Sequence, residues 1–434
     1  MRTALPTLLL SAALAHAQSA PARVDSSTVS YVASGVQVIH RRTASNNVVA
    51  NLYLLGGARQ VTRATAGIEP FLLQVSEAGT LRYPKAALRR VMARTGSGIV
   101  VEARDDWTLY GLRTTTQAFD SVWSVFADRL MAPRLDSADV EQERTRFLSA
   151  IRQRAEDPDA LLERTADSVF YGDHPYGLPV EGSETSIARF TRGTLRAYLT
   201  AQMVTSRMLL VVVGNVPRAV IEARIASTLG KLPRGAYAWT LPDALPPSGS
   251  AAAIVARSLP TNYLAGYYRG PRAGSADAAA LRIATAVLSG ELYSEIRSRR
   301  NLTYAVNAPF RDEGLVSGGL YVTTTEPDSV LALMKESIAL VQAANIPADG
   351  LRSLIQQFIT EYFLDNETST AQADFLARNQ LYRGDWRAGD RFIAELRAVT
   401  GEDVRRVAQK YFRDVRWAYV GNPARVRREG LVGF

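Results

Sequence analysis

The order of predicted strands and helices partly repeats on the two sides of a Pro- and Gly-rich stretch at residues 235–250, and this repeat is the strongest constraint on the fold. Apolar alternation and helical spacing predict strands and helices in a similar order in each half. In the first half we expect strands at 36–40, 48–55, 99–103, 107–114 and 208–213, and helices at 66–75, 84–95, 121–131 and 138–155. In the second half we expect strands at 251–256, 262–268, 304–308, 318–325 and 416–420, and helices at 276–288, 292–299, 329–344, 348–363, 371–382, 388–399 and 401–411.

The pattern lacks the regular strand-helix alternation of a doubly wound parallel sheet. It therefore favours an α+β fold with two pseudo-symmetric domains, each a mainly antiparallel sheet flanked by helices. The composition of residues 235–250 is typical of an exposed connector. We predict an N-terminal domain at 18–234 and a C-terminal domain at 251–434, both within the usual size range of domains.

The first 17 residues have the pattern of a secretory signal peptide. Met1 and Arg2 open a positive segment, residues 4–14 are apolar, and Ala15 and Ala17 place small side chains before a cleavage site. The apolar stretch is shorter than the roughly 20 residues of a membrane span. We expect a cleaved leader, no membrane span, and a periplasmic or secreted protein.

Composition excludes several kinds of chemistry. The chain has no cysteine, so it has no disulfide, no thiolate zinc site and no cysteine nucleophile. Its net charge of +9 comes mostly from arginines that are scattered along the sequence. Nucleic-acid binding requires clustered basic residues, so we expect no nucleic-acid partner.

Residues 54–80, LLGGARQVTRATAGIEPFLLQVSEAGT, resemble the signature region of the insulinase, pitrilysin and mitochondrial-processing-peptidase family. In that region a Gly-rich strand end leads into a helix with an H-x-x-E-H motif. Further segments are similar to the family at residues 96–112, 131–151, 174–177, 182–216 and 267–319. The resemblance covers nearly the whole chain after the leader and implies the insulinase-type peptidase fold.

The resemblance also assigns positions to the family's zinc site, and this chain lacks the ligands there. Pro70 and Gln74 stand where two histidines are expected, Leu73 where the catalytic glutamate is expected, and Ala150 where a distal glutamate ligand is expected. The resemblance therefore implies that this chain binds no metal and has no catalytic residues of its own.

Other sites for a metal or a nucleophile are poorly supported. Outside the leader the histidines are His40 and His174, and neither has a helical histidine partner three or four residues away. Glu69 and Glu77 flank the degenerate motif, and we interpret them as a solvated helix face. The sequence has no G-x-S-x-G motif for a serine nucleophile.

The second half keeps a segment similar to the family's L-R-E-x-x-G-L-x-Y segment, at residues 296–304. From spacing alone, Arg297 ends a surface helix and Tyr304 begins a buried strand. The resemblance instead implies that Arg297 and Tyr304 bind substrate, through a planar guanidinium and a hydroxyl that donates to an oxyanion. Asn301 replaces the family's glycine, and asparagine tolerates the left-handed backbone that glycine adopts.

These residues imply a non-catalytic subunit of a heterodimeric zinc metallopeptidase, inactive alone. Its partner would be a homologous chain with an intact H-x-x-E-H helix, which holds the zinc. An unfolded peptide would bind by strand addition to a sheet edge, which we place near residues 320–325.

Two alternatives stay open. The first is a structural or peptide-binding protein of the same fold with no role in proteolysis. The second is an independent hydrolase that uses other chemistry. The long Gly-rich loop of the inactive processing-peptidase subunit is not visible in this sequence.

Overall fold

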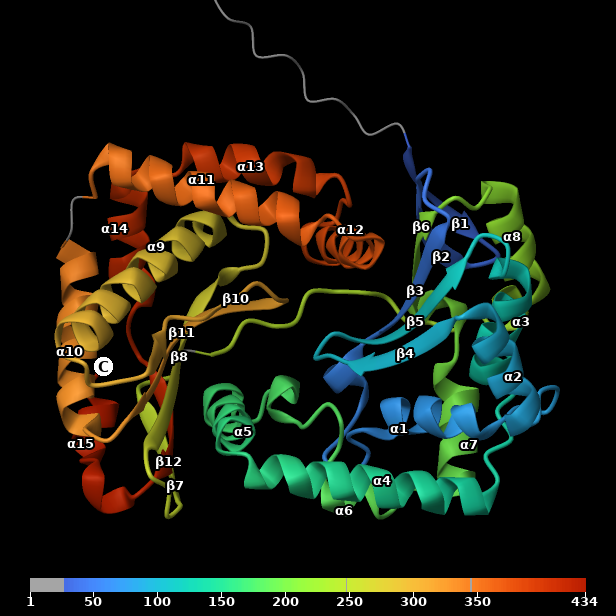
Figure 1. Ribbon diagram of the computed structural model, residues 1–434, viewed down its shortest axis with the longest axis horizontal. Helices are drawn as coiled ribbons and strands as arrows, with labels where there is room; N and C mark the ends of the chain where they lie inside the picture. The colour runs from blue at the N-terminus through green and yellow to red at the C-terminus, as the bar shows by residue number, and fades with distance from the viewer. Residues whose placement is uncertain (1–26, 247, 344–345) are drawn as a thin grey trace, which may run out of the picture.

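The computed structural model describes residues 27–246, 248–343 and 346–434, and consists of two sheets with helices around and between them (Figure 1). The predicted leader lies outside the described residues. The prediction of an α+β fold with two sheet-and-helix domains is confirmed.

The first sheet has the strand order β1-β2-β6-β3-β5-β4. β2 and β6 are parallel, and every other neighbouring pair is antiparallel. Its strands are β1 (Thr28–Ala33), β2 (Val36–Arg42), β3 (Asn47–Leu55), β4 (Gly98–Ala103), β5 (Trp107–Thr115) and β6 (Met208–Gly214).

The second sheet repeats this topology. Its order is β10-β11-β8-β12-β7, with β9 also paired to β11, and β7 with β12 is its parallel pair. The strands β7, β12, β8 and β11 thus correspond to β2, β6, β3 and β5 of the first sheet. The strands are β7 (Ala251–Ala256), β8 (Asn262–Arg272), β9 (Ala305–Asn307), β10 (Phe310–Arg311), β11 (Leu315–Thr324) and β12 (Arg416–Gly421).

The helices of each half pack mainly on one face of that half's sheet. The first half contains α1 (Ile68–Val75), α2 (Lys85–Thr95), α3 (Phe119–Met131), α4 (Ser137–Glu156), α5 (Pro158–Tyr171), α6 (Glu184–Ile187), α7 (Arg192–Gln202) and α8 (Arg218–Ser227). The second half contains α9 (Ala276–Leu292), α10 (Pro327–Ala343), α11 (Ala348–Asp365), α12 (Ser369–Arg383), α13 (Ala388–Ala398), α14 (Gly401–Tyr411) and α15 (Arg428–Val432).

Each half also contributes one helix to the other half's sheet. α12 packs on β3 and β6 of the first sheet, and α5 packs on β8 and β12 of the second sheet (Figure 1). The middle strand β6, MLLVVVG, is fully buried along its length. A strand covered on both faces needs apolar side chains at every position, which explains this unbroken apolar run.

The predicted peptide-binding edge near residues 320–325 is wrong. β11 pairs with β8 from Leu315 to Thr324, and on its other side it pairs with β9 from Tyr321 to Thr323. Its main-chain groups are therefore used on both sides, because the short segment that follows residue 304 returns to cover the expected edge. Sequence periodicity does not show which strands are neighbours.

Within the described residues, no single helix is long and apolar enough to span a membrane. α10 and α11 pass that test only as a pair, and they are bent by 109° relative to one another.

Polar contacts join the two halves around a small cavity. The Tyr382 hydroxyl of α12 donates to Asp106 Oδ2 over 2.9 Å, and Arg311 of β10 donates to Asp167 Oδ1 of α5 over 2.5 Å. Tyr382 and Asp106 also line a cavity of about 30 Å³, whose lining includes Asp105 from the first half and Glu313 from the second.

Two of these carboxyl groups are held toward their neutral form. Burial raises the pKa of Asp105 well above its usual value, and the Glu313 carboxylate raises it further. Burial likewise raises the pKa of Glu313. A raised pKa means that the acid's contribution to stability is full below its unfolded pKa of about 4 and is lost as pH rises through the folded value.

We therefore expect the double variant Asp105→Asn, Glu313→Gln to be less sensitive to increasing pH than the natural chain. Urea unfolding between pH 4 and pH 9 should show the unfolding free energy of the natural chain falling relative to the variant as pH rises. Glu402→Gln on the exposed side of α14 is the control. Parallel pH profiles for the natural chain and the double variant would contradict the assignment.

Candidate functional site

The helix that carries the degenerate zinc motif is part of the core. In α1, every residue except Gln74 is buried. The helix starts after Gly67, whose φ is 82° and where an added Cβ would lie 2.5 Å from the Glu181 carbonyl oxygen. Only glycine fits this turn without strain. Pro70 lies in the first helical turn, where a missing N–H leaves no helical hydrogen bond unmade.

Three of the positions assigned to zinc binding lie on α1, and the fourth lies on the neighbouring helix α4. α1 packs against α4, and the rings of Phe71 and Phe147 are 5.1 Å apart. Ala150 is exposed, one helical turn beyond Phe147. Pro70 and Leu73 are buried, and the Gln74 amide donates to Glu77 Oε2 over 3.0 Å. The two-helix arrangement is present, and its side chains offer no set of metal ligands.

The histidines do not supply a substitute. Within the part of the chain that the structure describes, no group of three or more His, Cys, Asp or Glu side chains is placed to hold a metal ion. His40 lies buried in β2, and burial lowers its pKa. His174 begins the turn Pro175–Gly177, and its Nδ1 accepts a hydrogen bond from the Tyr176 amide over 3.2 Å.

Glu69 is not on a solvated face, contrary to the sequence interpretation. It is 4% exposed, and its Oε2 lies 3.0 Å from Arg207 Nη1 and 2.9 Å from the Tyr198 hydroxyl, which donates to it. Arg207 also donates to the carbonyl oxygens of Leu55 and Gln202. Burial acts to lower the pKa of Arg207, but Glu69 and Tyr198 together outweigh it, so the net shift of the Arg207 pKa is upward. This buried triad joins α1 to β3 and α7.

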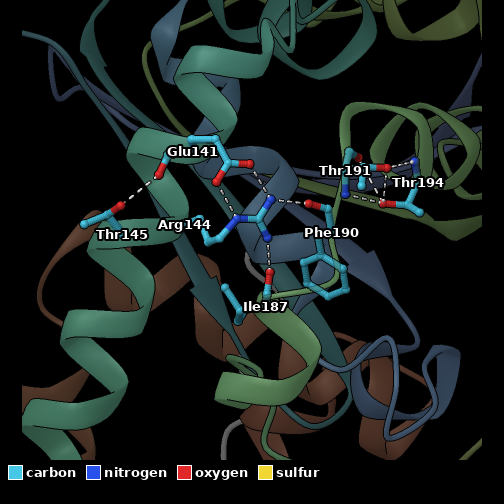
Figure 2. A network of polar contacts seen from close by, with 7 residues as sticks. All are labelled: Glu141, Arg144, Thr145, Ile187, Phe190, Thr191 and Thr194. Carbon is cyan, nitrogen blue, oxygen red and sulfur yellow. Dashed lines mark hydrogen bonds and ion pairs between the residues drawn. The ribbon is translucent and has the colours of Figure 1, made fainter.

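Arg144 holds α4 in place against the segment between α6 and α7 (Figure 2). Arg144 pairs with Glu141 and donates to the main-chain carbonyls of Ile187 and Phe190, between α6 and α7. These contacts fix the helix that bears Ala150. The Arg144 side chain therefore has a structural role in this chain.

Arg297 lies in a π-helical segment, Tyr293–Arg299, that continues α9. Asn301 ends the segment with a φ of 52°, which confirms the expected left-handed turn. The amides of Asn301 and Leu302 donate to the carbonyls of Arg297 and Ile296 over 3.1 and 3.0 Å. Asparagine thus closes the helix as glycine does elsewhere. π-helical turns are often found at functional sites.

Tyr304 is directed outward by its buried neighbour Thr303. The Thr303 hydroxyl oxygen accepts from the Ala305 amide over 3.0 Å, and its single proton lies within hydrogen-bond reach of the Thr323 carbonyl oxygen at 2.5 Å, so Thr303 fixes the backbone at the start of β9. Tyr304 itself is 85% exposed. The interpretation from spacing alone, in which Tyr304 begins a buried strand, does not fit this exposure.

The structure brings Arg297 and Tyr304 together and adds a residue that the sequence analysis missed. The Arg297 Cζ lies 5.1 Å from the centroid of the Tyr304 ring and 5.1 Å from that of Tyr293. Tyr293 could have been found from the sequence, because it is an aromatic residue four positions before Arg297 on the same helix. Spacing of four residues places side chains on one helical face.

The Arg297 segment and the degenerate motif do not meet within this chain. α1 belongs to the first half, and α9 with its π-helical extension belongs to the second, on the opposite side of the molecule (Figure 1). Among the described residues, no hydrogen bond or ion pair joins the two segments.

Two descriptions of known protein families match this chain. The family description "Insulinase (Peptidase family M16)" matches residues 37–184, and "Peptidase M16 inactive domain" matches residues 189–358. The chain belongs to the insulinase family.

Relatives and solved structures of this M16 chain agree with its fold. The mitochondrial-processing peptidase subunit beta of Blastocladiella emersonii is 24% identical over 397 residues, which is 86% of this chain and 84% of the relative. The uncharacterized zinc protease YmxG of Bacillus subtilis is 21% identical, over 87% of this chain and 94% of the relative. A protease from Helicobacter pylori superposes with a TM-score of 0.81 at 16% identity, over 91% of this chain and 99% of that chain.

The buried triad leads to a stability prediction. Glu69→Ala should lower the unfolding free energy by about 3–5 kcal/mol, because it leaves the Arg207 charge buried without its carboxylate. Urea unfolding followed by circular dichroism measures the loss. Glu222→Ala is the control, because Glu222 and its partner Arg218 are both exposed, at 40% and 54%, and loss of such a surface pair should change the unfolding free energy by about 1 kcal/mol or less. Equal, small losses in both variants would show that Glu69 is not held as described.

Proposed function

We propose that this M16 chain is a non-catalytic subunit of a heterodimeric zinc metallopeptidase, and that it contributes substrate contacts to a partner that hydrolyses peptides. The observation that carries the proposal is the contrast between two segments. Arg297 and Tyr304 are close together and accessible, whereas the zinc-motif positions on α1 carry no ligands and are largely buried.

The separation of the two segments supports an active site shared between chains. A guanidinium and a tyrosine hydroxyl assist peptide hydrolysis by holding the substrate and donating to the oxyanion that forms when water attacks. Arg297 and Tyr304 are far from α1 of their own chain, so the zinc and the activated water would come from a second, homologous chain. One relative is named as a subunit of a processing peptidase, which agrees with an assembly of this kind.

An extended peptide is the substrate that fits this proposal. Strand addition to the outer strand of a sheet gives affinity through main-chain hydrogen bonds with little sequence preference. β1 and β4 are the outer strands of the first sheet. The zinc would be bound by the partner, and both chains would be exported to the periplasm or beyond.

The proposal predicts a specific partner. Tagged chain purified from its own host should retain, in near-equal amount, an exported homologue with an intact H-x-x-E-H helix, identified by mass spectrometry. The purified pair should hydrolyse an unfolded protein such as reduced casein, and a chelator should stop it. Recovery of this chain without such a homologue would favour a structural or peptide-binding protein. Chelator-resistant hydrolysis by this chain alone would favour an independent hydrolase.

Within the pair, Arg297→Ala should reduce kcat/KM about 10²- to 10³-fold, which is the usual effect of removing one oxyanion or substrate donor. Arg299→Ala is a matched control, because Arg299 lies on the same turn and pairs with Glu295 over 2.7 Å. Arg299→Ala should leave kcat/KM within a factor of about 2, as expected for a surface ion pair. If Arg297→Ala keeps the kcat/KM of the natural pair as Arg299→Ala does, Arg297 takes no part in the reaction.

A further inference from the structure

Arg297 differs from the arginines beside it in how its charge is held. Arg299 and Arg300 both pair with the carboxylate of Glu295. Arg297 has no ion pair and no side-chain hydrogen bond to any residue in the described ranges, and its guanidinium instead lies over the rings of Tyr293 and Tyr304. Stacking on an aromatic face stabilises a cation without using its N–H donors.

Tyr293 makes few contacts other than the one with Arg297. It is 48% exposed, and its hydroxyl makes no hydrogen bond within the part of the chain that the structure covers. Its ring contacts the guanidinium at the same centroid distance as the Tyr304 ring, 5.1 Å. Among the described residues the two rings are not paired with each other, and each makes its own contact with the guanidinium.

The backbone around Tyr293 is fixed. The π-helical segment continues α9, whose buried residues anchor it, and Ile296 between Tyr293 and Arg297 is fully buried. The left-handed Asn301 then turns the chain so that Tyr304 approaches the same guanidinium. Two rigid backbone segments thus carry one aromatic ring each to a single flexible side chain.

We infer that Tyr293 is a positioning residue of the substrate-binding pair, which holds the Arg297 guanidinium so that its N–H donors are available to a carbonyl or carboxylate oxygen of a bound peptide. This inference rests on the proposed function. An arginine side chain has many rotamers, and binding must order it at an entropic cost. Two flanking rings reduce that cost before the peptide arrives.

The contact itself is tested in the isolated chain, without any partner. With ¹³C- and ¹⁵N-labelled arginine, the ring currents of two tyrosines should shift the Arg297 side-chain signals, which the Arg297→Lys variant assigns. Tyr293→Leu should remove a large part of that shift, Tyr293→Phe should keep it, and thermal unfolding should confirm that both variants are folded. An unchanged shift in Tyr293→Leu would overturn the inference.

The consequence for substrate is tested in the reconstituted pair with casein as the probe. Tyr293→Leu should raise KM about 2- to 5-fold with a smaller change in kcat, as expected from the loss of one exposed cation–π contact. Tyr293→Phe should restore the natural KM, and Tyr293→Leu should have no further effect when Arg297 is already alanine. An equal effect in the Arg297→Ala background would overturn the inference, because Tyr293 would then act independently of Arg297.

The two failures can be told apart. If the proposed function is wrong, Arg297→Ala leaves hydrolysis unchanged or no active pair forms, whatever the ring-current result. If only the role of Tyr293 is wrong, Arg297→Ala still lowers kcat/KM strongly, while Tyr293→Leu changes neither the Arg297 signals nor KM.

Discussion

The reciprocal packing of α12 and α5 is the constraint on which the rest of this structure depends. Each sheet has a face that its own helices do not cover, and each half closes that face with a helix from the other half. Leu376 and Ala377 of α12 belong to the same buried cluster as Val211 of β6, and Leu162 of α5 packs with Ala418 of β12. Burial of apolar area is the main favourable term in folding, so the halves stabilise one another.

Much of the secondary structure could be predicted from the sequence, because packing of this kind requires apolar residues at regular positions. The pairing of the strands could not. Strands such as β3 and β6 and helices such as α14 show clear apolar periodicity or uniform burial, and their positions were predicted within a few residues. The pairing of β9 with β11 was not predicted, because β9 is only three residues long and the chain reverses between residues 307 and 315 without the short turn that would have identified the pair. Periodicity describes which side of an element is apolar, and says little about its neighbours.

Some residues of the candidate site could be predicted from the sequence and others could not. Arg297 and Tyr304 were found through a resemblance between segments, and the left-handed Asn301 followed from the physical properties of asparagine. Glu69 was misread because an acidic residue near a helix start normally faces water, and its partner Arg207 is 138 residues away. A buried ion pair between such distant residues leaves no local sign in the sequence. Tyr293 had a local sign, but an aromatic residue on a helix is usually part of the core.

The burial of α1 limits what substitutions in this helix can produce. In an active metallopeptidase, the zinc helix must leave imidazoles and a carboxylate accessible to metal and water. Here the same helix has Phe71, Leu72 and Leu73 in the core and Glu69 in a buried ion pair. Histidine at position 70 and glutamate at position 73 would place polar groups among the apolar neighbours that pack against Pro70 and Leu73. A metal site on α1 would therefore require the surrounding core to be repacked, and single substitutions in this helix would destabilise the fold before they produced a set of ligands.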